Sequence, residues 1–319
     1  MSLQELGLSP EAEALAQALL LGDKSALSAD VIDAYRTAGM SHIMAVSGLH
    51  VGIVMSLLWL LFQPIEWLVI LVSPVRMLTH YILGDVKRIL VIAATVSYVI
   101  YIGAPPSAVR AALMLSLLLL GWMFQRPTST WRCLALAAFI LLAWDPWTIT
   151  TPGFQLSFLA VVGILLFQPW LQSELLPRWW RLILLSVAAQ WFTTPIVAFW
   201  FHQVPFFGWL QGLLVVPLLP LLIGSLIIGL VFPSFTLSGF LVEVLTAWMG
   251  WVAQMVGRIE SLVLGGHLYF YPNWWQTLMA EVMFLAIYVY LRLTYAPTKQ
   301  QLEDERLRQR DLEEQNIQR

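Results

Sequence analysis

The hydrophobic positions of this chain fall into long apolar runs that are separated by short polar or proline-containing stretches. A run of about 20 apolar residues is long enough to cross a bilayer as an α-helix. The runs predict membrane segments near 43–62, 65–83, 88–102, 108–124, 131–143, 154–171, 180–201, 207–231, 237–257 and 275–295. The third and fifth are short enough to be tilted, re-entrant or buried inside the bundle. We therefore expect an all-α, polytopic helical membrane protein with about eight to ten membrane segments, some broken by proline or glycine.

The two ends of the chain are more polar than this apolar middle, so the pattern predicts three parts. Residues 1–40 are expected to form two short amphipathic surface helices, because Ser9 precedes a proline at one helix start and Ser28 can cap the second. Residues 41–295 form the transmembrane domain. In residues 296–319 acidic and basic side chains are closely mixed, which is typical of a solvated helix or a disordered tail.

Composition supports the membrane class and limits the kind of nucleic-acid contact that the chain can make. The 319 residues are 59% hydrophobic and 11% charged, whereas soluble domains are about 25% charged. The formal net charge of −2 lacks the basic excess that is typical of nucleic-acid-binding proteins. Any contact with nucleic acid must therefore be local.

Basic residues alternate between the predicted connections. Those before or between segments are Lys24, Arg36, Lys87, Arg88, Arg126, Arg132, Arg178 and Arg181. The intervening connections, near Pro64, Pro105, Pro146 and Pro205, carry almost no lysine or arginine. The positive-inside rule therefore predicts that both termini are cytoplasmic.

The first membrane segment begins with polar and small residues. They are Ser41, His42, Ser47, Gly48, His50 and Gly52. Polar groups in lipid have to face other helices or a water-filled cavity, and glycines four residues apart let a second backbone approach closely. The stretch therefore predicts either a polar lining at the mouth of a pathway or histidines that are hydrogen-bonded between packed helices. A metal site is not indicated, because the further ligands of a motif such as His-Glu-x-x-His are missing.

A second break in the apolar pattern places an arginine at the start of a helix. After two prolines, Ser107 is expected to cap the helix, and Arg110 falls in its first turn. A helix N-terminus next to a guanidinium is a good site for an anion. The alternative is an arginine that snorkels to the lipid headgroups.

A third break precedes two polar residues of the sixth segment. Asp145-Pro146 opens a turn, and Gln155 and Ser157 then enter an apolar run. Buried amides and hydroxyls need partners, so both side chains should point inward, along a pathway or as hydrogen bonds between helices. A later aromatic cluster, 199–203, is more typical of a membrane-interface belt than of a stacking platform for bases.

The last two segments carry carboxylates within apolar sequence. Glu243 begins a stripe with Thr246, Gly250 and Gln254 at close to helical spacing, and Glu281 lies inside the final segment. A charged side chain in the bilayer costs about 2–3 kcal/mol on insertion scales, so both carboxylates should be paired or hydrated. The stripe predicts a helix interface or a cavity lining.

These motifs, in this order, resemble the ComEC-type competence family of bacterial inner-membrane proteins. The stretch 41–52 is similar to the family signature, and a Pro-Ser-x-x-Arg-Ala element and a Gly-Phe-Gln-Leu-Ser-Phe block follow it. The matching positions of these two elements are Pro106, Ser107, Arg110, Ala111 and 153–158. The likeness extends from about Ala18 to Arg292, and many relatives have asparagine where this chain has Gln211.

The resemblance implies an inner-membrane channel that takes up single-stranded DNA during natural transformation. Candidate residues of the DNA pathway are His42, Ser47, Gly48, His50, Ser107, Arg110, Gln155, Ser157 and Glu243. The motifs at Gly48, Arg110 and Gln155 are then expected to meet at one pathway. The resemblance also implies that the domains flanking this one lie outside the membrane, which opposes the orientation that the charge pattern favours.

The expected partners are the lipid bilayer, single-stranded DNA and a separate cytoplasmic motor or DNA-binding protein, because the chain lacks a phosphate loop. The oligonucleotide-binding-like and metallo-β-lactamase-like domains of many relatives are not found in it. Nor is a His-x-His-x-Asp-His cluster, so nuclease activity is expected elsewhere. We expect no enzymatic activity, cofactor or metal in this chain. Association into a homo-oligomer stays open.

Two other classes of function compete with the channel. A proton-coupled small-molecule transporter fits the proline-broken helices and the carboxylates Glu243 and Glu281, although no internal repeat is evident. An intramembrane enzyme would use His42, Ser47 and His50, but no carboxylate lies near them in sequence to orient a histidine.

Overall fold

The computed structural model describes residues 6–44, 46–72, 76–126, 128–173, 176–204, 206–232, 236–264 and 269–295. These residues are almost entirely helical, and their β-structure is one isolated bridge between Gln203 and Tyr269. The predicted all-α class is confirmed. The predicted tail, 296–319, lies outside the described residues.

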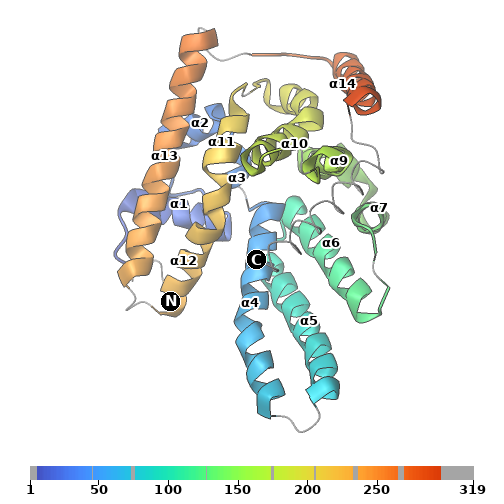
Figure 1. Ribbon diagram of the computed structural model, residues 1–319. Helices are drawn as coiled ribbons and strands as arrows, with labels where there is room; N and C mark the ends of the chain where they lie inside the picture. The colour runs from blue at the N-terminus through green and yellow to red at the C-terminus, as the bar shows by residue number, and fades with distance from the viewer. Residues whose placement is uncertain are drawn as a thin grey trace, which may run out of the picture. The chain divides into compact units, whose positions relative to one another are not determined.

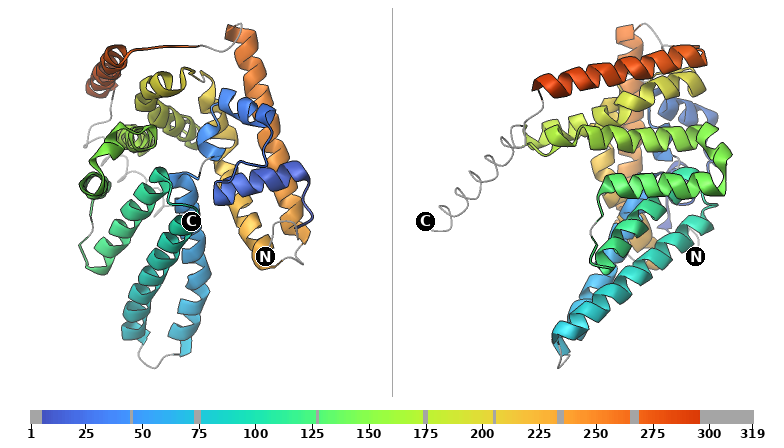
Figure 2. Two further views of the ribbon diagram at one scale, coloured as in Figure 1. Left: turned by 180° about the vertical axis from the view of Figure 1, so that it is seen from behind. Right: turned by 90° about the vertical axis from the view of Figure 1, so that its right-hand side faces the viewer.

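The chain forms two compact units, whose helices are drawn in Figures 1 and 2. Unit 1 comprises residues 1–157 and 205–267, and unit 2 comprises residues 158–204 and 268–319. Each unit therefore joins segments that are far apart in the sequence.

Most of the helices belong to unit 1. They are α1 (Pro10–Leu21), α2 (Ala29–Thr37), α3 (Ser41–Met44), α4 (Gly48–Val72), α5 (Arg76–Tyr101), α6 (Pro106–Met123), α7 (Thr130–Trp144), the 3₁₀ turn η2 (Pro146–Thr150), the start of α8 (Pro152–Leu166), α11 (Gly208–Leu214), η3 (Val216–Leu218), α12 (Leu219–Val231) and α13 (Thr236–Leu264). Unit 2 contains the remainder of α8, α9 (Gln168–Leu171), α10 (Arg178–Phe201) and α14 (Trp274–Tyr295).

Six helices of the described residues are long and apolar enough to cross a membrane. They are Gly48–Val69, Pro106–Met123, Trp179–Phe201, Gly208–Val231, Thr236–Val263 and Trp274–Thr294. The helices α7 and α8 are apolar but shorter. This chain is therefore a multi-pass membrane protein with a helical core.

The N-terminal helices begin where the sequence predicts, but α1 does not lie on the surface. Ser9 accepts a hydrogen bond from the Ala12 N–H at the start of α1, and Ser28 accepts one from Val31 at the start of α2. Most of α1 is buried, with Leu19 fully inaccessible in the main core of unit 1. The helix packs against α13, α12 and α3 because its alanine-rich sequence lets backbones come close.

Three predicted segments of the first hundred residues form two helices. The predicted connection at Pro64 is wrong, because Pro64 lies inside α4 and the chain turns back between Val72 and Arg76. An internal proline removes one backbone hydrogen bond, but membrane helices tolerate it when neighbouring groups satisfy the freed carbonyl. Lys87 and Arg88 consequently lie within α5, not in the loop that the topology prediction assigned to them.

The predicted segment 207–231 is a broken helix, as its prolines suggest. The short turn η3 separates α11 from α12 at Pro217. The carbonyl of Leu214 accepts a hydrogen bond of 3.1 Å from the indole N–H of Trp248 in α13. Figure 1 shows α12 and α13 side by side, so a neighbouring helix satisfies the backbone at the break.

Gly163 in α8 sets how closely α8 and α10 pack in unit 2. A Cβ atom at this position would overlap the carbonyl oxygen of Ala188. Gly163→Ala is expected to lower the stability of the protein by about 1–3 kcal/mol, because overpacking forces backbone shifts. Thermal unfolding of the purified chain in detergent measures the change.

Gly250→Ala in α13 is the matched control. A Cβ there meets no atom within 4 Å, and alanine is favoured over glycine in a helix. Its stability should be unchanged or slightly higher, and an equal loss in both variants would contradict the close packing at Gly163.

Candidate functional site

The starts of α4 and α6 meet in unit 1. Ser107 Oγ of α6 donates a hydrogen bond of 3.0 Å to the carbonyl oxygen of Val46, just before α4. Gly48 leaves so little room that a Cβ there would lie 2.8 Å from Nη2 of Arg110 and 3.2 Å from Cβ of Ala111. The glycine of the first motif therefore allows the second motif to approach, as the sequence predicts. Gly52 has no atom within 4 Å of its Cβ position and does not share this role.

Arg110 connects the third motif, residues 153–158, to the contact between the starts of α4 and α6. Its Nε donates to Ser157 Oγ of α8, and its Nη1 lies 3.6 Å from the sulfur of Met114. At the start of α8, a Cβ on Gly153 would be 3.6 Å from Pro106. The motifs at Gly48, Arg110 and 153–158 thus come together, and this convergence confirms the expectation that they meet. We call Val46, Gly48, Ser107, Arg110, Gly153 and Ser157 the three-motif junction.

The junction differs from the predicted anion site in two ways. Ser107 does not cap α6, because Pro105 takes the N-cap position without a side-chain hydrogen bond and the serine hydroxyl instead reaches Val46. Arg110 is only 7% exposed, so it neither snorkels to headgroups nor presents an open guanidinium. Both side chains tie helices together in the observed state.

His50 is almost fully buried beside the junction and organises the start of α4. Its Nδ1 accepts a hydrogen bond of 3.3 Å from the backbone N–H of Ser47 and lies 3.0 Å from Ser47 Oγ. Because a backbone N–H can only donate, Nδ1 is the acceptor in this contact. The histidine therefore acts as a hydrogen-bond acceptor here.

The described residues contain no group of three or more histidine, cysteine, aspartate or glutamate side chains that could hold a metal ion. His42 lies in α3, and the structure does not describe its side chain.

Gln155 and Glu243 both have hydrogen-bond partners outside the junction. The Gln155 amide donates a hydrogen bond of 3.0 Å to the carbonyl of Ile149, so it returns to the turn that precedes α8. Glu243 accepts hydrogen bonds from the backbone N–H and hydroxyl of Ser9, the latter at 3.0 Å. Its carboxylate thus ties α13 to the N-terminus of α1, where the helix dipole favours a negative charge.

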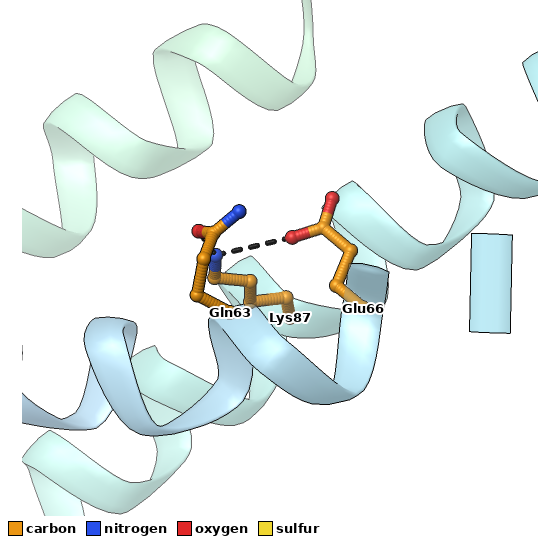
Figure 3. Close-up of polar contacts among 3 residues, drawn as sticks. All are labelled: Gln63, Glu66 and Lys87. Atoms are coloured by element: carbon orange, nitrogen blue, oxygen red, sulfur yellow. Dashed lines mark hydrogen bonds and ion pairs between the residues drawn. The ribbon is translucent and has the colours of Figure 1, made fainter. Parts of the chain in front are cut away.

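Sequence reasoning missed a buried polar cluster between α4 and α5. Lys87 Nζ lies 3.1 Å from Glu66 Oε2 and donates to Gln63 Oε1 (Figure 3). It also stands 3.8 Å from the ring centre of Trp59. The side chains of Lys87 and Glu66 are 4% and 8% exposed. A small cavity of about 260 Å³ adjoins them, lined by Trp59, Gln63, Glu66, Gly84, Lys87, Arg88 and Trp122.

The sequence contains a pattern that indicates this cluster, but the helix break predicted at Pro64 concealed it. Trp59, Gln63 and Glu66 follow a spacing of four and three residues, which places them on one face of a continuous helix. Once a break is assigned at Pro64, Glu66 falls outside the first segment and Lys87 falls in a loop. The pairing of Glu66 with Lys87 can be predicted only if one helix is assumed to continue through Pro64.

Comparison with known proteins shows which family the chain belongs to. The family described as "Competence protein" matches residues 19–294. The chain belongs to this competence family. It is also 30% identical over 210 residues to "ComE operon protein 3" of Bacillus subtilis (strain 168). This match covers 66% of the chain but only 25% of that relative. No solved structure matches.

The matched region of the competence family includes the whole three-motif junction and the buried pair. Gly48→Ala is expected to displace Arg110, because the methyl group would lie within 3 Å of the guanidinium. We expect a loss of stability of about 1–3 kcal/mol. Gly52→Ala is the matched control one helical turn away and should be neutral, which thermal unfolding of both variants can show.

The buried pair can be tested by a double-mutant cycle. Glu66→Gln and Lys87→Met should each cost about 3–5 kcal/mol, because each leaves its partner charge buried and unpaired. The double variant should lose less than the sum of the two. The control is Asp85 and Arg88, an ion pair within α5 with side chains 23% and 25% exposed, whose loss should cost at most about 1 kcal/mol. Additive losses in the first pair, measured by denaturant unfolding, would contradict a direct coupling.

Proposed function

We propose that this chain forms an inner-membrane channel for single-stranded DNA during natural transformation. The observation that carries the proposal is the convergence of the three family motifs at one junction. Membership of the competence family and the apolar spanning helices support it. Because the matched relative is much longer than this chain, the activity is proposed for the part of a pathway that these residues supply.

The junction has a chemistry that suits a passing phosphate. The helices α4, α6 and α8 all begin there, and the first N–H groups of a helix have no partner within it. The aligned peptide dipoles make these ends partly positive, and Arg110 adds a full charge. A few fixed positive groups can guide phosphates without holding them, and weak binding suits conduction.

Passage of a strand requires the junction to open. Arg110 and His50 are buried in the described state, and Gly48 is packed against Arg110. In our proposal this state is closed, and a strand separates α4 from α6 and α8 so that the guanidinium exchanges Ser157 for a phosphate oxygen. Arginine suits this exchange because it remains charged and can bind phosphate through two N–H groups.

The proposed channel needs a separate source of driving force. Each phosphate that enters a negative-inside cell works against about 2.3 kcal/mol per 100 mV. We therefore propose a separate cytoplasmic motor or DNA-binding protein as partner, and a nuclease that acts elsewhere. The chain itself would carry no enzymatic activity, cofactor or metal, and association into a homo-oligomer is compatible with its exposed apolar helices.

One observation favours the proton-coupled transporter as a second candidate. Glu281 lies in the membrane helix α14, and its Oε1 is buried without a hydrogen-bond partner among the described residues. Intramembrane carboxylates of this kind mark ion pathways in many transporters. Glu243, the other carboxylate of this hypothesis, already bonds Ser9.

Replacement of Arg110 tests the channel. Arg110→Gln should reduce uptake of labelled DNA about tenfold or more, because a charge-assisted hydrogen bond contributes about 1.5–3 kcal/mol and each 1.4 kcal/mol is a factor of ten. Arg110→Lys should retain part of the uptake. Transformation frequency in a transformable host, with the membrane-inserted protein quantified by immunoblot, gives the measurement.

Arg126→Gln provides the control, because this arginine is exposed after α6 and outside the junction. Normal uptake in Arg110→Gln at a normal protein level would refute the role of the arginine. Normal transformation after deletion of the gene would refute the channel itself. Normal DNA uptake in both Arg110→Gln and Glu281→Gln, together with proton-coupled uptake of a small solute that is lost in Glu281→Gln, would favour the transporter.

A further inference from the structure

Exposed aromatic side chains gather where α10 ends and α14 begins, within unit 2. Phe201, Tyr269, Phe270, Tyr271, Trp274 and Trp275 are each between 46% and 76% exposed. We call these six residues the aromatic rim. They come from two parts of the chain that are about 70 positions apart, so the sequence cluster at 199–203 contains only a fraction of the rim.

Backbone hydrogen bonds hold the two parts of the rim together. The N–H of Phe270 donates to the carbonyl of His202 at 3.0 Å, and Gln203 pairs with Tyr269 in an antiparallel bridge. The rings of His202 and Tyr271 are 4.8 Å apart, and those of Trp274 and Trp275 are 3.9 Å apart. The fold therefore holds these aromatic side chains together as one surface.

The rim carries no formal charge. Residues 196–204 and 269–276 contain no lysine, arginine, aspartate or glutamate. Single-stranded nucleic acid is bound by aromatic rings together with a positively charged groove, because the backbone needs cations. A rim of rings without cations fits the lipid headgroup region better, where amphipathic rings are enriched.

The opposite end of the same two helices has a different composition. Trp179 and Trp180 stack at 4.7 Å at the start of α10, followed by Arg181, and Arg292 lies near the end of α14. We call these four residues the guanidinium rim. The helices α10 and α14 pack together (Figure 2), joined by a hydrogen bond of 3.1 Å from the Trp191 indole to the carbonyl of Phe284.

The spacing of the two rims matches a bilayer. Trp180 and Phe201 are 21 residues apart in α10, which corresponds to about 32 Å at 1.5 Å per residue. Trp275 and Arg292 are 17 residues apart in α14, or about 26 Å. The hydrocarbon core of a bilayer is about 30 Å thick. In both helices, the stretch between the two rims is therefore about as long as the hydrocarbon core is thick, and the rims lie at the two edges of that core.

We propose that the aromatic rim is a lipid-binding surface seated in the headgroup region of one leaflet, with the guanidinium rim in the headgroups of the other. The two rims then differ in charge. Indole and phenol rings anchor the first through their apolar faces and polar edges, whereas the second adds two guanidinium groups that bind lipid phosphates beside its own indole rings. This role fixes the depth of unit 2 in the membrane and does not depend on what the chain transports.

Spin labels on the full chain test the depth of the rim. Cys133→Ser removes the native thiol, and Tyr271→Cys or Trp275→Cys then introduces one label site in the rim; Val282→Cys, an exposed position mid-way along α14, is the reference. In phosphatidylcholine vesicles, collision rates with oxygen and with a water-soluble nickel chelate report depth. We expect the rim labels at headgroup depth and the Val282 label deep in the hydrocarbon.

Two results would overturn the placement of the aromatic rim, and a third would overturn the difference between the leaflets. One is nickel access at both rim sites equal to that of a freely solvated label. The other is protection of the rim labels by a single-stranded oligonucleotide, which would make the rim a stacking platform for bases. Addition of phosphatidylglycerol should change the collision rates of a label at Trp180→Cys more than those of the label at Tyr271→Cys. An equal change at both would refute the difference between the leaflets.

Discussion

Lipid offers no hydrogen-bond partners, and this constraint accounts for most of the contacts that define the fold. Backbone polar groups inside the membrane have to be satisfied by the chain itself, and polar side chains are stabilised when they find partners there. Ser107 therefore bonds the carbonyl of Val46, Trp248 bonds the carbonyl that the break at η3 frees, and Lys87 bonds Glu66 and Gln63. Each of these contacts ties a helix to another part of the chain, so satisfying the polar group also positions the backbone.

The same constraint links structure to the proposed function. Arg110 is held by Ser157 and packed against Gly48, which places a guanidinium among the starts of three helices. In our proposal the guanidinium exchanges its contact with Ser157 for a ligand of similar chemistry. A phosphate oxygen is such a ligand, which is why we place the proposed DNA pathway at the junction and not at the more conspicuous histidines.

Local chemistry predicted helix starts and the meeting of motifs better than it predicted burial. The caps of Ser9 and Ser28 and the role of Gly48 follow from the sequence. The burial of α1 does not, because an alanine-rich helix can lie on a surface or in a core with equal local propensity. Pro64 misled the prediction for a similar reason, since a proline ends a helix in water but is tolerated inside one in a membrane.

The sequence by itself determined the all-α membrane class, the competence family and the three motifs, because apolar run length and motif order are properties of the chain alone. Only the tertiary structure decided which side chains meet: Arg110 with Ser157, Lys87 with Glu66, and Glu243 with Ser9. The aromatic rim was likewise decided only by the tertiary structure. Partners that are distant in sequence are chosen by how helices pack, and packing depends on the whole set of surfaces that each helix presents.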